Sequence, residues 1–219
     1  AVLHESDDPA RRVRARLVLL DTVGQALGSA GHLIEDGLAD AGTDPALLGP
    51  LRFWSAVREL LGGRTGSAAL EARRAAALAA AAHDRATRVA ALGLLGTLHG
   101  LRGHPRLAAS ALELAVQLTP RQPSASLLRR QALAELDGDR LAEAEALTAR
   151  LLSRAGGGGG IEDRMATLVA LTRVHARAGD AMRAREAAAR CARLLVDAGT
   201  ASPLAAYAEA LAEAVGGDP

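Results

Sequence analysis

Apolar residues recur along this chain at steps of three and four positions, which is the spacing of one face of an α-helix. Between Asp8 and Leu27 this face consists of Val13, Leu17, Leu20, Val23 and Leu27. The apolar and polar residues do not alternate as they would in a strand, and valine and isoleucine are too scattered to build a sheet. The pattern therefore predicts an all-α protein.

Glycine- and proline-rich breaks divide this helical pattern into short segments. They predict about eleven helices of about 11–20 residues, joined by short turns. Because short turns place consecutive helices side by side in opposite directions, we expect a series of antiparallel helix hairpins. Equal-sized hairpins in series are typical of a repeat protein.

The clearest repeat unit lies near the middle of the chain. Its small, apolar and turn-forming residues stand at fixed spacings: Leu92, Leu95, Gly96, His99, Gly103, Ala108, Leu112, Ala115 and Pro120. This pattern resembles a tetratricopeptide repeat. The resemblance implies that a second helix crosses the first at Gly96 and that Gly103 turns the chain. It also implies helix contacts at Ala108 and Ala115 and a helix end at Pro120.

The same register extends, less completely, over nearly the whole chain. The resemblance implies a single domain over residues 1–219, folded as a right-handed superhelix of about five antiparallel tetratricopeptide-like hairpins plus a C-terminal capping helix. Its parts are degenerate hairpins at 9–41 and 45–82, repeats at 84–120, 122–154 and 161–198, a flexible glycine linker at 155–160 and the capping helix at 202–215. His99 and His175 stand where the repeat has an aromatic residue, and we expect them to fill space between helices.

The composition limits the cellular location and the classes of partner that we expect. The formal net charge of +1 gives no electrostatic case for a nucleic-acid partner. All 26 basic residues are arginine, which indicates a GC-rich bacterial genome. Cys191 is the only cysteine, so an intramolecular disulfide is excluded and a reducing cytoplasm is the expected location. Apolar runs stay below the roughly 18 residues of a membrane span, and a chain that starts at Ala1 without Met is expected to be an excised fragment.

Alanine-rich, arginine-rich repeats with few aromatic residues also resemble the central segment of large ATP-binding LuxR-type bacterial regulators, the class similar to the maltose-regulon activator. In that family an ATPase module precedes the repeats and a helix-turn-helix follows them. The resemblance implies a sensing or relay domain of a transcriptional regulator. The alternative is a free-standing scaffold that docks a peptide or helix in its concave groove, and a hydrolase or transferase is the remaining class.

Three stretches imitate known sites. Leu118–Arg121 imitates the start of a LuxR-type DNA-binding domain but lacks the recognition helix that should follow, so we expect no direct nucleic-acid contact by this segment. The glycines at 156–160 follow a helix and lack the Lys-Ser or Lys-Thr of a phosphate loop. Residues 62–67 are interpreted as a turn in which Ser67 caps the next helix, and the alternative is an anion held by backbone amides and Arg64.

The sequence offers no set of residues for catalysis or metal binding. No two of the six histidines stand four positions apart on a helix, and Cys191 takes the place of a small buried residue. Neither a serine–histidine–acid set nor a carboxylate pair can be assembled. We therefore predict no enzymatic activity, no cofactor and no metal.

The concave groove is the remaining candidate for a binding surface, because the first helix of each hairpin lines it in such repeats. The register places four arginines near that side, and these are the candidate ligand-binding residues: Arg52, Arg129, Arg173 and Arg177. Guanidinium groups suit carboxylates and phosphates because their planar donors bond two oxygens at once. The expected ligand is a protein partner or an anionic small-molecule effector, with ordinary solvated arginines as the alternative. Trp54 is expected to pack between hairpins, no membrane contact is predicted, and homo-oligomerisation is left open.

Overall fold

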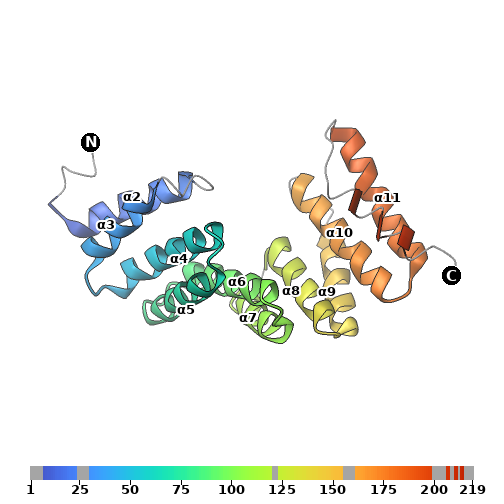
Figure 1. Cartoon of the computed structure of the whole chain (residues 1–219), viewed down its shortest axis with the longest axis horizontal. Helices are drawn as coiled ribbons and strands as arrows, with labels where there is room; N and C mark the ends of the chain where they lie inside the picture. The colour runs from blue at the N-terminus through green and yellow to red at the C-terminus, as the bar shows by residue number, and fades with distance from the viewer. Residues whose placement is uncertain are drawn as a thin grey trace. The chain divides into compact units, whose positions relative to one another are not determined.

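The structure is a computed structural model that describes residues 7–23, 30–119, 123–154 and 161–198 together with residues 206, 207, 210, 211, 213 and 214. Throughout these residues every regular element is a helix, as Figure 1 shows. The all-α fold class is therefore confirmed. The chain forms two compact units, residues 1–119 and residues 120–219, and the single domain over residues 1–219 stays a prediction.

The first unit contains three helix hairpins in its described residues. Their helices are α2 (Pro9–Val23) and α3 (Gly31–Ala41), α4 (Pro45–Leu61) and α5 (Thr65–Ala81), and α6 (Arg85–Leu101) and α7 (Pro105–Gln117). The two helices of each hairpin pack against each other, and each hairpin also contacts the next through α3 with α4 and α5 with α6. This is the arrangement that stacked repeats need in order to bury a continuous core.

The second unit contains two hairpins in its described residues. They pair α8 (Ala125–Asp137) with α9 (Leu141–Arg154), and α10 (Ile161–Arg177) with α11 (Ala181–Ala198). Helix α10 packs against both helices of the preceding hairpin. Within the predicted capping helix, residues 206, 207, 210, 211, 213 and 214 are helical, and its other residues lie outside the described part of the chain.

Four hairpin turns close in the same way. After the first helix, one residue adopts a positive φ, and the residue that follows it donates its N–H to a carbonyl oxygen five positions back. The positive-φ residues are Gly63, Gly103, Asp139 and Gly179, with φ angles of 74°, 72°, 59° and 74°. Since this conformation favours glycine, the predicted role of Gly103 as the turn residue is confirmed.

Gly96 lies where α7 crosses α6. A Cβ atom built at Gly96 would stand 2.8 Å from Leu112 Cδ2 and 2.9 Å from Leu112 Cδ1, and closer still to Cγ. Carbon atoms in contact are ordinarily about 3.5–4.0 Å apart, so only glycine leaves room for Leu112 at this crossing. The close helix crossing predicted at Gly96 is therefore confirmed. Ala108 and Ala115, the predicted contact points, are both buried. Pro120 lies outside the described residues.

Alanine and leucine fill the interior of both units. The positions that the repeat register assigns to the interior are buried: Leu92, Leu95, Leu112, Leu128, Ala132, Ala144, Leu168, Leu171, Ala184, Ala188 and Cys191. Trp54 packs against an apolar cluster that includes Leu20, Ile34 and Leu51, from α2, α3 and α4. Its predicted place between hairpins is therefore confirmed.

An ionic clamp joins α2 to α3 in the first unit. Asp40 accepts hydrogen bonds from Arg12 Nε at 3.0 Å and Arg12 Nη2 at 2.6 Å, and a further one from Arg16. Arg16 is buried, with a side chain only 8% exposed. Hydrogen bonds from Arg12 and Arg16 hold the pKa of the Asp40 carboxyl well below its usual range, which keeps the clamp charged at neutral pH.

The predicted helix cap at Ser67 is wrong. Helix α5 begins at Thr65, directly after Arg64, and Ser67 lies in its first turn. The physical reason is the hairpin turn itself, because the Arg64 N–H bonds the Glu59 carbonyl oxygen at 2.9 Å and the chain enters α5 at once. The predicted glycine linker at 155–160 lies outside the described residues. Among the described helices, none combines the length and the apolar character that a membrane span requires.

Candidate functional site

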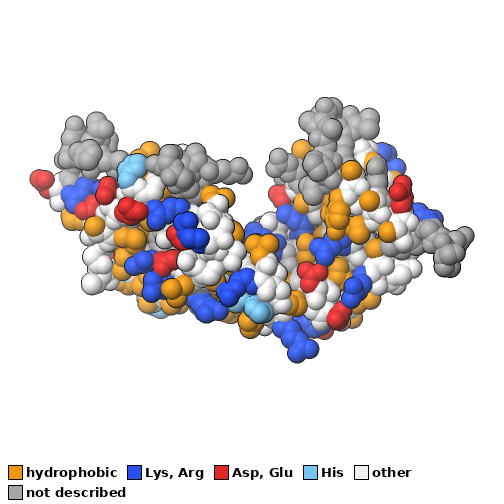
Figure 2. Space-filling model, in the orientation of Figure 1, with side chains coloured by type: hydrophobic (Ala, Val, Ile, Leu, Met, Phe, Trp, Pro, Cys, Tyr) orange, Lys and Arg blue, Asp and Glu red, His pale blue; other side chains and the backbone are white. Residues whose placement is uncertain are grey.

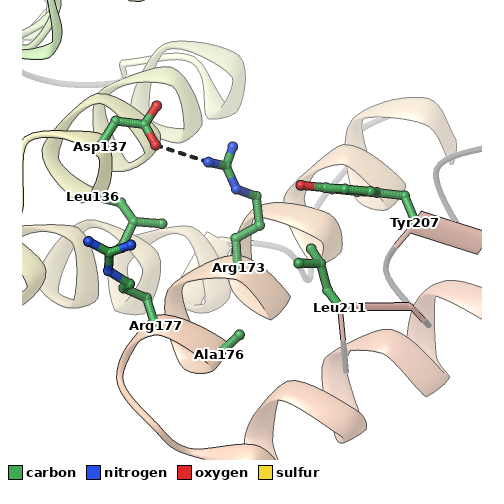
Figure 3. Close-up of a pocket in the computed structure, with 7 residues that line it drawn as sticks. All are labelled: Leu136, Asp137, Arg173, Ala176, Arg177, Tyr207 and Leu211. Atoms are coloured by element: carbon green, nitrogen blue, oxygen red, sulfur yellow. Dashed lines mark hydrogen bonds and ion pairs between the residues drawn. The ribbon is translucent and has the colours of Figure 1, made fainter. Parts of the chain in front are cut away.

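A pocket of about 490 Å³ opens in the second unit between α8, α10 and the C-terminal helical residues. Seven residues line it: Leu136, Asp137, Arg173, Ala176, Arg177, Tyr207 and Leu211. Figure 3 shows Arg173 reaching between Asp137 on one side and the ring of Tyr207 on the other. Helices α8 and α10 are the first helices of their hairpins, so the pocket lies on the helices that line the concave side of such repeats.

Two of the four candidate arginines share this pocket because they stand four positions apart on α10. Arg173 Nη2 lies 2.9 Å from Asp137 Oδ1, and Arg177 Nη2 lies 2.6 Å from Asp139 Oδ1. Each bond uses one terminal nitrogen of a guanidinium that carries five N–H donors. The acidic side chains therefore orient both guanidinium groups and leave further donors for a ligand.

Apolar side chains also line the pocket, and Figure 3 shows them on both sides of Arg173. Leu136, which is 6% exposed, lies on the side of Asp137, and Leu211 lies on the side of Tyr207. Tyr207, which is 47% exposed, contributes its ring with the hydroxyl directed toward Arg173 (Figure 3). This combination of apolar side chains and oriented donors suits a ligand that carries an apolar group next to a carboxylate.

The charges of the pocket are balanced. Asp137 and Asp139 neutralise the two arginines, and their side chains are 50% and 79% exposed. On the face shown in Figure 2, basic and acidic side chains are likewise interspersed among hydrophobic ones. This charge balance favours recognition of a ligand by short contacts over attraction by a long-range field.

The other two candidate arginines lie elsewhere. Arg129, on α8, has Nη1 3.4 Å from Asp163 Oδ1 and 3.3 Å from the Asp163 carbonyl oxygen on α10. Arg52, on α4 of the first unit, has Nη1 3.0 Å from Glu71 Oε2 on α5. Neither residue lines the pocket. Their role in ligand binding stays a prediction.

Three of these ion pairs connect α8 or its turn to α10, which joins the two hairpins of the second unit. Exposed ion pairs of this kind contribute about 0–1 kcal/mol each. Their main effect is to fix the direction of the guanidinium groups. Sequence reasoning placed Arg173 and Arg177 on the first helix of a hairpin, where the structure has them, but it did not find Tyr207 and Leu211, which come from a later segment of the chain and have no motif of their own.

The described residues contain no group of three or more His, Cys, Asp or Glu side chains placed to hold a metal ion. Cys191 is fully buried. His99 is 7% exposed, in keeping with its expected place between helices. None of these observations assigns chemistry to the pocket beyond binding.

Comparison with known proteins shows the fold. No protein-family profile and no curated protein matches this sequence. Among solved structures, BtubC (BKLC) from P. vanneervenii superimposes with a TM-score of 0.77 at 20% identity, over 90% of this chain and 85% of that one. Two structures of a putative kinesin light chain from Podospora anserina, described as nearly identical TPR-like repeats, give TM-scores of 0.70 and 0.68 at 16% identity. They cover 89% and 88% of this chain and 99% of theirs. The chain therefore has the fold of tetratricopeptide-like helical repeats.

Proposed function

We propose that this chain is a non-enzymatic helical-repeat interaction module whose pocket on α10 binds a short segment of a partner protein. The observation that carries the proposal is that one pocket combines Arg173 and Arg177, each bonded to an acidic side chain, with apolar side chains. The described lining residues supply binding groups but no nucleophile with an adjacent base, which acyl or group transfer would require. The similar repeat structures support a scaffold role.

The partner segment carries an acidic side chain next to an apolar one. Its carboxylate accepts from the free donors of Arg173 and Arg177, while its apolar side chain packs on Leu136 and Leu211. Because the arginines are already neutralised by Asp137 and Asp139, binding depends on these short contacts and responds weakly to salt. A small effector with a carboxylate would use the same donors, and Arg52 and Arg129 are proposed as further contacts along the first helices.

Peptide selection tests this proposal. A random peptide library displayed on phage is selected against the chain, and the selected peptides are measured by isothermal titration calorimetry. Two charge-assisted hydrogen bonds of about 1.5–3 kcal/mol each give an expected loss of about a hundredfold or more in affinity for the Arg173→Gln/Arg177→Gln variant. The matched control is Arg190→Gln/Arg193→Gln on α11, two exposed arginines that do not line the pocket.

Equal affinity for both variants contradicts the proposal, as does a selected peptide set without acidic residues. If peptides fail to enrich while anionic small molecules raise Tm in the wild type and not in the Arg173→Gln/Arg177→Gln variant, the effector takes the place of the partner segment. The melting temperature of each variant shows whether it is folded.

A finer proposal concerns the protein that contains this module. We propose that it serves as the sensing or relay domain of a LuxR-type transcriptional regulator in a GC-rich bacterium. The support is compositional: alanine-rich repeats in which arginine is the only strong base. The full gene tests it directly, since an ATPase module upstream and a helix-turn-helix downstream are expected. If neither module is encoded there, we propose a free-standing cytoplasmic scaffold instead.

A further inference from the structure

Four hairpin turns pair the same two positions. In each turn the backbone N–H of the residue before the second helix donates to a carbonyl oxygen five positions earlier, at 2.8–2.9 Å. We call the two residues joined by this backbone bond a couple. The four couples are Glu59 with Arg64, His99 with His104, Glu135 with Arg140, and His175 with Asp180.

Two of these couples are ion pairs. Arg64 Nε lies 2.6 Å from Glu59 Oε2, and Arg140 contacts the Glu135 carboxylate across the equivalent turn. The carboxylate is the more buried partner in both, with side-chain exposures of 15% for Glu59 and 6% for Glu135. Opposite charges therefore reinforce the backbone bond that closes the α4–α5 and α8–α9 turns.

The α6–α7 turn has histidine at both positions. The rings of His99 and His104 lie 6.5 Å apart between centroids. His99 is 7% exposed, and its Nδ1 atom is buried without a hydrogen-bond partner in the described part of the chain. A neutral imidazole tolerates this environment far better than an imidazolium does.

Among the described residues, the charged or titratable groups that act on His99 are all basic. Arg73 belongs to α5, Arg102 follows α6, and His104 precedes α7. Helix α4 also packs against α6, but among the described residues it adds no charged group to this set. Burial lowers the pKa of His99, and Arg73, His104 and Arg102 lower it further.

We propose that the α6–α7 turn is a pH-sensitive latch that opens in the mildly acidic range, where the turns closed by Glu59–Arg64 and Glu135–Arg140 stay shut. Protonation of His99 places a buried cation near Arg73 and Arg102, at a position where the other two turns have an ion pair. The first unit thereby contains a hairpin whose docking depends on proton concentration.

The sign of the pH dependence follows from proton binding. The open turn exposes His99, which then titrates near the ordinary histidine pKa of about 6.5, whereas the closed turn keeps it neutral at lower pH. The closed turn therefore has its full stability above about pH 7 and loses it as the pH falls. Between about pH 7.5 and about pH 5.5 the opening constant rises, with about tenfold as the limit that His99 alone can contribute.

Hydrogen–deuterium exchange of the full chain measures this opening. After correction for the intrinsic pH dependence of exchange, we expect protection in α6 and α7 to fall more than in α8 and α9 between about pH 7.5 and about pH 5.5, with about tenfold as the limit for one histidine. An NMR titration of the histidine rings should show His99 titrating below the ordinary histidine pKa of about 6.5. Equal loss of protection in both hairpins, or ordinary titration of His99, would overturn the proposal.

Replacing both histidines of the α6–α7 turn gives a variant matched to the turns that are closed by ion pairs. His99→Glu/His104→Arg installs the couple found in the α4–α5 and α8–α9 turns, where a largely buried glutamate is accommodated. We expect the excess loss of protection in α6 and α7 at acidic pH to disappear in this variant. His99→Gln, which keeps a polar but neutral side chain, should remove most of it if the double variant fails to fold. Persistence of the full excess in either folded variant contradicts the latch.

Discussion

Replacing Gly96 with alanine should destabilise the protein, although the same change stabilises most helices. In an open helical position, alanine is favoured over glycine by about 1 kcal/mol. At Gly96 the new methyl group would overlap Leu112, whose side-chain carbons stand within 2.9 Å of its place. Leu112 is 1% exposed, so it has no route to turn away toward solvent.

The expected magnitude is the difference between two effects. Overpacking a well-filled core costs about 1–3 kcal/mol, and the gain in helix propensity offsets about 1 kcal/mol of it. We therefore expect Gly96→Ala to lower the free energy of unfolding by about 1 kcal/mol and Tm by about 2–4 °C. Gly96→Leu, which adds three more carbons at the same crossing, should cost more.

The sign of the effect should reverse when Leu112 is shortened. Leu112→Ala alone should cost about 2–5 kcal/mol because it leaves a cavity. In that background the methyl group of Gly96→Ala enters the vacated space, so the second substitution should stabilise by about 1 kcal/mol. The preceding hairpin shows that the combination packs, since Ala56 and Ala72 occupy the corresponding positions 40 residues earlier and are fully buried.

Urea denaturation followed by far-UV circular dichroism measures the four proteins of this cycle. Gly100→Ala is the matched control, because Gly100 lies on the same helix and a Cβ there would meet no atom within 4 Å. It should leave stability unchanged or raise it by up to about 1 kcal/mol. The reasoning is refuted if Gly96→Ala is as stable as the wild type, or if its effect has the same sign with Leu112 and with alanine at that position.

Three further changes test other contacts. Asp40→Asn should lower Tm by about 5 °C or more, because it leaves the buried Arg16 with only the exposed Asp36 carboxylate, 3.9 Å away; thermal melts of both proteins check this. Since the pKa of Asp40 is lowered, its contribution is present above about pH 4 and is lost as the pH falls further, so wild type and Asp40→Asn should converge in strong acid. His83→Gly should raise Tm because it relieves a positive φ of 56°. Asp139→Gly relieves a positive φ of 59° but also removes the ion-pair partner of Arg177, so it should raise Tm less or not at all.

The features that could be predicted from sequence are those that depend on nearby residues. The crossing at Gly96 and the turn at Gly103 follow from spacings within one hairpin, and both are present in the structure. The misplaced cap at Ser67 had a local cause as well. A serine is a common cap, but the turn bond from Arg64 to Glu59 starts the helix earlier.

The candidate site depends on residues far apart in the chain, and less of it could be predicted from the sequence. A helical register placed Arg173 and Arg177 on the first helix of a hairpin. It could not show that Asp137 and Asp139, on a different hairpin, pair with them, because such contacts depend on how two hairpins stack. For the same reason, the sequence could not predict that Tyr207 lines the pocket.

The scarcity of aromatic residues leaves ionisable side chains at one position of each of these four turns. His99 and His175 occupy the position where a tetratricopeptide repeat has an aromatic residue, and Glu59 and Glu135 hold the equivalent place in their own turns. An aromatic ring at that position would pack without regard to pH or salt. Here three of the four turns instead have paired side chains, which form an ion pair in two turns and a pair of histidine rings in one. The hairpins are therefore alike in backbone geometry but differ in their response to protons, so a change of pH can act on one repeat while its neighbours stay closed.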